Sequence, residues 1–341
     1  MGKSRKIALL VSVLLVLALS VSPVHCFYSN PISETKSFTT TLRVTSPPCA
    51  DIIPASVLLE IYGRELEENG IYIEFIPSKG PWDMIAHLQR GDVDVALYSL
   101  AGGARLYAKG LKELKLVGVF VWKYLYVVGK EDINGWEGLR GKTILIPCRG
   151  GCPDMAFRIC AKEAGYNPDK DFKIEYLPCA QIMQLLLAGK ADAAALPEPH
   201  ATLLILKSEG KIKIILDLQE EFIRTHPDWT EEGYPGGSLW VVASNVKGKG
   251  KAVELFISTF KRAVEYTNKH PSEAGNITGK YLEKYFGRKF PAKAVTESLK
   301  SGRLYIEFKE AKSLNATIVK FLRTINYPVP DRRIYYEVAE G

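Results

Sequence analysis

The chain has 341 residues, of which 47% are hydrophobic and 24% are charged. This is enough apolar material for a large core and more length than one α/β unit needs, so two similar units are expected. The formal net charge of +7 includes Lys3, Arg5 and Lys6, which lie in a segment that we expect to be removed. The other basic residues are scattered and are not interleaved with aromatic residues, so nucleic acid is not an expected partner.

The first residues have the pattern of an export signal. A basic start is followed by an apolar run over residues 7–19, which is shorter than the roughly 20 residues of a membrane-spanning helix. We therefore assign residues 1–26 to a signal peptide and residues 27–40 to a polar leader. Cys26 is a candidate for lipid attachment, although the residues before it depart from the usual box, so attachment and simple cleavage both stay open. The protein is expected outside the cytoplasmic membrane, in the periplasm or on the outer face of the cell membrane.

Strands and helices alternate in the first part of the chain. Strands are predicted over residues 42–45, 71–76 and 93–98, with helices over residues 53–69 and through Met84 and Leu88. Such a β-α-β-α-β run specifies a parallel sheet with helical crossovers.

An internal echo indicates a second unit of the same kind. Residues 73–78 (IEFIPS) recur as residues 174–179 (IEYLPC), and residues 88–96 recur as residues 186–194 with the pattern Gly-x-x-Asp before a strand. Each block is a strand, a helix and a strand. Chance similarity is the alternative, because Gly-x-x-Asp is common at helix ends, but two blocks in the same order favour a repeat.

Two extended segments lie where the chain would cross between the units, at residues 116–128 and 239–243. We therefore predict an α/β protein of two similar lobes, each a mostly parallel sheet flanked by helices, joined by two β crossovers. The predicted boundaries are 41–121 for lobe 1 and 122–243 for lobe 2. Residues 244–341 are predicted to form a C-terminal helical segment that packs back on lobe 1.

A binding site is expected between the lobes. Parallel α/β sheets bind ligands beyond the carboxyl ends of their strands, where loops lead into helix N-termini. Applied to both units, this rule nominates a set of ligand-binding residues: Ser46, Cys49, Trp82, Tyr98, Ser99, Trp122, Arg149, Gly150, Gly151, Cys179, Glu198 and Tyr234.

These candidates would contribute different chemistry. Arg149, Gly150 and Gly151 precede a helix that begins near Pro153, and free amides with a guanidinium would hold an anionic group there. The alternative is an ordinary glycine turn with a surface arginine. The aromatic candidates would stack on a flat or apolar solute or belong to the core, and the two serines are hydroxyl donors. Glu198, between two prolines, either contacts the solute or favours the helix dipole.

Five cysteines remain if Cys26 is removed or lipidated, so they cannot all pair within the chain. Cys148 and Cys179 end consecutive strands and are the predicted disulfide, which an oxidising compartment permits. A metal site built from the cleft cysteines matches no standard zinc spacing, and small buried thiols are the third alternative.

Four motifs give the chain a resemblance to a known family. These are residues 91–96 (GDVDVA), 139–144 (LRGKTI), 189–194 (GKADAA) and 196–201 (LPEPHA), and the last is the most specific. Over residues 42–285 the chain resembles the extracytoplasmic solute-binding proteins for nitrate, taurine, alkanesulfonates and thiamine-pyrimidine precursors, which have the periplasmic binding protein type II fold. It departs from them at residues 147–154, where relatives carry Gly and Ser in place of cysteines.

The resemblance implies a function. A small solute, either a sulfonate- or nitrate-like anion or a thiamine-pyrimidine-like heteroaromatic, would be captured between the lobes and delivered to the permease and ATPase of an ABC importer. No cofactor, metal or catalytic residue is expected, and the protein is expected to be a monomer. The alternatives are a ligand-sensing module and an enzyme like the fungal thiamine-pyrimidine synthases. Of the five histidines only His200 is well placed for the cleft, and no nucleophile, base and acid spacing emerges.

Overall fold

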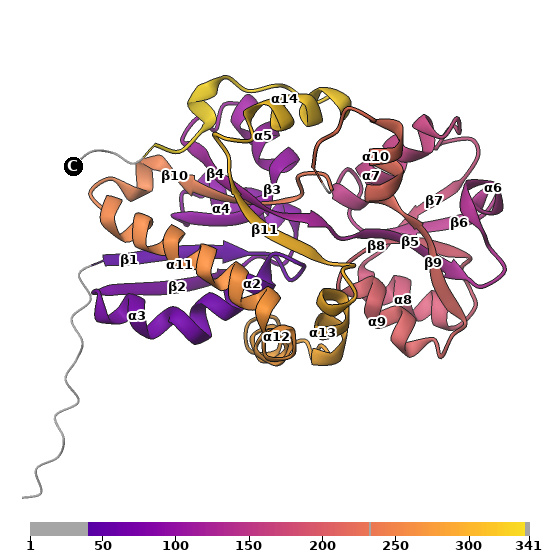
Figure 1. Cartoon of the computed structure of the whole chain (residues 1–341), viewed down its shortest axis with the longest axis horizontal. Helices are drawn as coiled ribbons and strands as arrows, with labels where there is room; N and C mark the ends of the chain where they lie inside the picture. The colour runs from indigo at the N-terminus through magenta and orange to yellow at the C-terminus, as the bar shows by residue number, and fades with distance from the viewer. Residues whose placement is uncertain (1–39, 232, 338–341) are drawn as a thin grey trace, which may run out of the picture. The chain divides into compact units, whose positions relative to one another are not determined.

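The computed structural model describes residues 40–231 and 233–337, so the predicted signal peptide and leader, together with Cys26, lie outside the described residues. The described strands form two sheets (Figure 1). The first sheet has the order β11-β4-β10-β3-β1-β2. Its strands are β1 (Thr40–Ser46), β2 (Ile71–Pro77), β3 (Val95–Ser99), β4 (Leu114–Lys123), β10 (Gly237–Val242) and β11 (Tyr305–Glu310).

The second sheet has the order β7-β6-β8-β5-β9. Its strands are β5 (Leu125–Lys130), β6 (Thr143–Ile146), β7 (Lys173–Tyr176), β8 (Ala193–Pro197) and β9 (Ile212–Asp217). In the first sheet β1 runs parallel to β2 and β3, and in the second β6 runs parallel to β7 and β8, whereas β10 and β5 run antiparallel to their neighbours. The strand orders β2-β1-β3 and β7-β6-β8 are equivalent, which confirms the prediction of two similar α/β lobes.

Helices cover the sheets. In the first lobe they are α2 (Ile52–Val57), a π-helical turn (Leu58–Tyr62), α3 (Gly63–Glu68), α4 (Pro81–Arg90) and α5 (Leu100–Ala108). In the second they are α6 (Gly135–Leu139), α7 (Cys152–Glu163), α8 (Cys179–Leu187), α9 (His200–Lys207) and α10 (Leu218–Thr225). A 3₁₀ turn (Ala243–Val246), α11 (Gly250–Lys269), α12 (Pro271–Phe286), α13 (Ala292–Lys300), α14 (Asn315–Thr324) and a last 3₁₀ turn (Arg332–Ile334) follow. Among residues 40–231 and 233–337, no helix has the length and apolar character needed to cross a membrane.

The repeated Gly-x-x-Asp motif has the same structural role in each lobe. Gly91 and Gly189 end a helix in the left-handed region, with φ of 72° and 70°, a conformation that glycine adopts without strain. Three residues later, Asp94 accepts a hydrogen bond from the backbone N–H of Arg43 at 2.8 Å, and Asp192 accepts one from Thr143 N–H at 3.2 Å. Each aspartate therefore ties the start of the lobe's third strand to its central strand.

The structure differs from the predicted lobe boundaries in one strand. Strand β10, placed within residues 122–243 of lobe 2 by the sequence, lies between β3 and β4 in the first sheet. The second crossing of the chain therefore precedes Gly237. Antiparallel pairing with strands more than a hundred residues away decides this position, and the local sequence pattern carries no such information.

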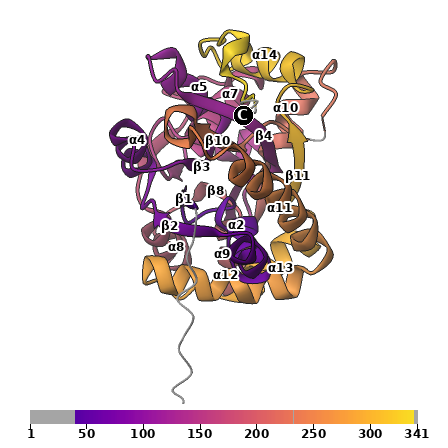
Figure 2. The same ribbon diagram turned by 90° about the vertical axis from the view of Figure 1, so that its left-hand side faces the viewer.

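The C-terminal segment contains a strand as well as helices. Strand β11 pairs antiparallel with β4 and extends the first sheet. Helices α11 and α12 pack against α2 of the first lobe (Figure 2), whereas α13 packs against α9 of the second lobe. The segment thus contacts both lobes.

Candidate functional site

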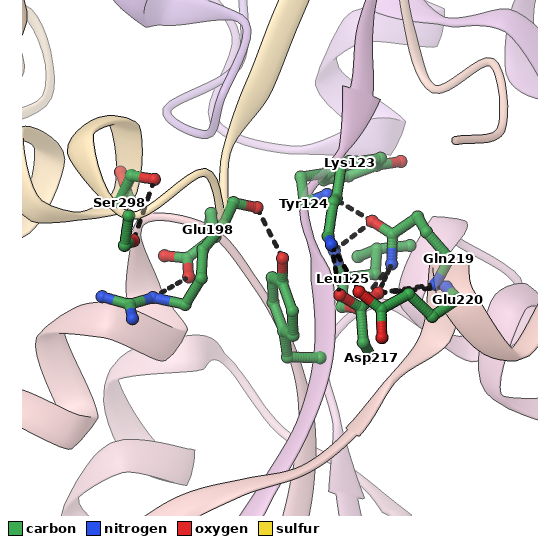
Figure 3. Close-up of polar contacts among 11 residues, drawn as sticks. Lys123, Tyr124, Leu125, Glu198, Asp217, Gln219, Glu220 and Ser298 are labelled. Carbon is green, nitrogen blue, oxygen red and sulfur yellow. Dashed lines mark hydrogen bonds and ion pairs between the residues drawn. The ribbon is translucent and has the colours of Figure 1, made fainter. Parts of the chain in front are cut away.

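The first crossing between the sheets is a break of one residue. Strand β4 ends at Lys123 and β5 begins at Leu125, so Tyr124 alone separates them. The fully buried side chain of Gln219, in the first turn of α10, fixes this break (Figure 3). Its Oε1 accepts from the backbone N–H groups of Tyr124 and Leu125, the latter at 2.7 Å, and its Nε2 donates to Leu125 C=O at 2.6 Å. One amide side chain therefore satisfies the backbone groups that the strand break frees.

The second crossing runs beside the first. Tyr234 N–H donates to Trp122 C=O at 3.1 Å, and Gly236 N–H donates to Val121 C=O at 2.9 Å. A Cβ on Gly233 would lie 2.1 Å from Trp122 O, and one on Gly236 would lie 2.5 Å from the Tyr124 ring. The glycines of this segment are required because the two crossings touch.

The strand ends of the two lobes meet next to these crossings. Asp51, at the N-terminus of α2, accepts a hydrogen bond from the Cys49 thiol at 2.7 Å. From the other lobe, Cys152 begins α7. Burial raises the pKa of the Cys152 thiol, and hydrogen bonding with the hydroxyls of Tyr124 and Ser99 opposes the rise. Because Ser99 ends β3 of the first lobe, this thiol contacts the first lobe and the crossing together.

We call the region around Asp51 and Cys152, where the strand ends of the two lobes meet, the seam. Several residues that the sequence predicted belong to it. Cys49 and Ser99 line it from the first lobe, and the buried ring of Tyr234 lies 6.2 Å from that of Tyr124. Tyr98 is half-buried, and burial raises its pKa, with the Cys152 and Cys148 thiols among the further causes. These residues come from the first lobe and the second crossing, and each of them interacts with Asp51 or Cys152.

Trp82, Trp122 and Ser46, which the sequence also predicted, lie outside the seam. Trp82 is 83% exposed on α4, and Trp122 is buried in the first sheet, where its Nε1 donates to Glu307 C=O at 2.8 Å. Ser46 is fully buried, and its hydroxyl donates to Pro47 C=O at 3.2 Å. These three have no contact with Asp51 or Cys152 among the described hydrogen bonds.

The glycine turn at the start of α7 is occupied by the protein's own carboxylate. Asp154 accepts from Gly150 N–H at 2.8 Å, and Gly151 N–H donates to Cys148 C=O at 2.7 Å. Arg158 pairs with Asp154 at 2.8 Å. Arg149 is exposed, with its guanidinium carbon 5.6 Å from the centre of the Tyr176 ring. The amide and the guanidinium proposed for an anion are thus engaged with other groups in this structure.

Glu198 is fully buried at the start of α9. It accepts from the Thr202 hydroxyl at 2.9 Å and lies 3.4 Å from Arg303 Nε, while its backbone N–H donates to Tyr124 C=O at 2.7 Å. Burial raises the pKa of Glu198 to about 7, and the Thr202 and Arg303 contacts oppose the rise. His200, two residues on, packs edge-on against Phe290, and burial lowers its pKa to about 4.

All five described cysteines are free thiols, so the predicted Cys148–Cys179 disulfide is not formed in this structure. The two do interact, because the Cys148 thiolate would raise the pKa of Cys179, although burial raises that pKa more, to about 12. Within the described ranges no three His, Cys, Asp or Glu side chains are grouped to hold a metal ion.

Sequence reasoning missed Asp51, Tyr124, Gln219 and Arg303. Asp51 lies two residues after the candidate Cys49, and this position was a usable signal. Tyr124 and Gln219 carry no motif, because their roles depend on a strand break and on contacts 94 and 95 residues apart in sequence.

Two α/β lobes with opposed strand ends and two crossings define a periplasmic-binding-protein type of fold. The NMT1-like family matches residues 48–277, more than half of the chain, and the chain belongs to this family. The resemblance stated from the sequence motifs is confirmed for family and fold.

Solved structures agree on the fold. The periplasmic aliphatic sulphonate binding protein SsuA of Escherichia coli has a TM-score of 0.67 and 18% identity, covering 88% of this chain and 93% of that one. An ABC transporter protein of Parabacteroides distasonis has a TM-score of 0.65 and 19% identity, covering 87% and 99%. The putative binding protein YtlA of Bacillus subtilis is 25% identical over 151 residues, which span 43% of this chain and 45% of that relative. At such identities the structural likeness shows a shared fold.

Proposed function

We propose that the protein is an extracytoplasmic solute-binding protein, which captures a small molecule between its lobes and delivers it to the permease and ATPase of an ABC importer. The observation that carries the proposal is the seam itself. Strand ends of two equivalent lobes meet beside two crossings, and buried polar and aromatic side chains from both lobes face each other there. Relatives described as binding proteins support the assignment.

The mechanism follows from the crossings. A solute that contacts both lobes binds more tightly to the closed arrangement than to an open one, and this difference shifts the population toward closure. Residues 124 and 233–236 would absorb the rotation, because they are the short segments between the sheets. The solute classes that the sequence motifs suggest are a sulfonate- or nitrate-like anion and a thiamine-pyrimidine-like heteroaromatic.

Small-angle scattering with and without a bound solute tests the proposal. A thermal-shift screen across sulfonates, nitrate, pyrimidines and amines first identifies a solute, because binding to the folded state raises the melting temperature. The radius of gyration is then expected to fall when the solute binds, with a parallel change in tryptophan fluorescence. The solute should be recovered unchanged after denaturation. A bound compound that leaves the scattering curve unaltered and emerges chemically modified would replace this proposal with an enzyme.

A further inference from the structure

Four acidic side chains in the described part of the chain are more than nine-tenths buried, and three of them are paired with cations. Asp94 lies 2.8 Å from Arg43 and 3.1 Å from Lys249, Asp154 lies 2.8 Å from Arg158, and Glu198 lies 3.4 Å from Arg303. The fourth is Asp51, which is 7% exposed.

Asp51 has a thiol where the other three have a cation. Its Oδ2 accepts the hydrogen bond from Cys49, and its Oδ1 is buried without a hydrogen-bond partner among the described residues. Burial raises the pKa of Asp51, and no lysine, arginine or histidine contributes to lowering it. A buried carboxylate oxygen without a partner is costly, so a group that supplies a donor or a positive charge there is strongly favoured.

Oδ1 lies next to Gly237, the residue at which the second crossing enters β10. A Cβ on Gly237 would lie 2.3 Å from it, so the backbone there approaches the carboxylate closely. The charge of Asp51 also raises the pKa values of Tyr124 and Cys152, which places the carboxylate beside the crossing and the opposite lobe. The unpartnered atom therefore belongs to the seam of the proposed binding site.

The surroundings favour a cation over an anion. The rings of Tyr124 and Tyr234 form one side of the seam, and aromatic faces attract positive charge. Arg149, the cation proposed for an anionic solute, is exposed and lies over Tyr176. An anion at this position would approach an acidic group whose pKa no arginine or lysine lowers.

We propose that Asp51 recognises a positively charged amino or amidinium group of the solute, and that the protein binds an organic cation or a basic nitrogen heterocycle. This inference rests on the proposed function and names the class of solute. Oδ1 accepts the N–H donors of the solute, and the rings of Tyr124 and Tyr234 lie beside its body. The sulfonate that the SsuA relative's name specifies would then be excluded by charge.

Titration calorimetry with defined probes tests the inference. Benzamidine and 4-aminopyrimidine serve as donor probes, and ethanesulfonate and nitrate serve as anions. We expect at least one donor probe to bind and both anions to fail. Asp51→Asn should weaken the donor probe by about 30-fold or more, which corresponds to the loss of one charge-assisted contact. Asp132→Asn, which changes an exposed carboxylate in the same way, should leave affinity within twofold.

A stability readout separates recognition from a structural role. Without a solute, Asp51→Asn should melt at the same temperature as the wild type or higher at pH 8, because the variant removes an unpaired buried charge. A large fall in melting temperature would show that Asp51 holds the fold together, and it would overturn the inference. Arg149→Ala should leave the affinity of the donor probe unchanged.

The outcomes distinguish this inference from the proposed function. If ethanesulfonate or nitrate binds and closes the lobes, the inference is wrong and the proposed function stands. If neither donor probe binds, or if Asp51→Asn binds it within threefold of the wild type, the inference is likewise overturned. If a donor probe binds through Asp51 and is chemically converted, the inference stands and the carrier function fails.

Discussion

Replacing Gln219 with methionine should destabilise the protein through the crossing between the lobes. The two side chains have similar length, so packing is largely kept, but the backbone N–H groups of Tyr124 and Leu125 and the Leu125 C=O lose their partner. An unsatisfied buried polar group costs about 1–3 kcal/mol. With three groups affected and partial relaxation, we expect a loss of about 3–5 kcal/mol in the free energy of unfolding.

Urea unfolding followed by circular dichroism measures this loss. Gln181→Met, on an exposed position of α8, is the matched control and should change stability by less than about 0.5 kcal/mol. Gln219→Glu keeps one acceptor oxygen but replaces the donor to Leu125 C=O with a second oxygen, which also lies near Asp217 Oδ1. Its cost should therefore be at least that of Gln219→Met, because a buried acceptor then faces two others. A loss below about 1 kcal/mol for Gln219→Met would refute the reasoning, because water or a rearranged backbone would then satisfy the crossing.

Two further predictions concern stability. Because burial raises the pKa of Glu198 to about 7, the folded state binds this proton more tightly than the unfolded state, and the stability that the proton contributes is lost as pH rises through 7. In urea titrations from pH 5 to 8, Glu198→Gln should flatten this decline in the free energy of unfolding, and an unchanged slope would contradict the assignment. A Cβ at Gly103 would lie 2.2 Å from the Trp240 ring, so Gly103→Ala should lower the free energy of unfolding by about 1–3 kcal/mol. Gly63→Ala, in a helix where the added Cβ would have no atom within 4 Å, should raise it by about 0.5–1 kcal/mol, and equal melting temperatures for the two variants would be inconsistent with this packing.

The repeated units could be predicted because their signals are local. Each Gly-x-x-Asp block ends a helix, starts a strand and supplies an acid that ties the next strand, all within a few residues of sequence. Strands β10 and β11 show the opposite case. Their places beside β4 depend on pairings between residues about 120 to 190 positions apart. The alternation of polar and apolar residues along a strand cannot specify such distant partners.

The candidate site was predictable by region rather than by residue. The rule that ligands lie beyond strand ends placed Cys49, Ser99 and the start of α7 in one area, and the structure brings them together. It could not tell which side chain at a loop points inward. Arg149 and Asp51 occupy comparable loops of the two lobes, yet the arginine is exposed and the aspartate is buried. In one loop Asp154 accepts from Gly150 N–H, whereas in the other Asp51 Oδ1 has no hydrogen-bond partner among the described residues.

The C-terminal segment adds a third connection that constrains how the lobes can move. Helix α13 packs on α9, Arg303 contacts Glu198 and Thr202, and the Tyr126 hydroxyl donates to Arg303 C=O at 2.7 Å before β11 joins the first sheet. Glu198 N–H is at the same time bonded to Tyr124 C=O, so the third connection lies beside the first crossing (Figure 3). Atoms near a rotation axis move least. A rotation about Tyr124 would therefore displace the buried Glu198–Arg303 pair less than groups farther from the crossing, whereas a sliding motion of one lobe over the other would break the pair.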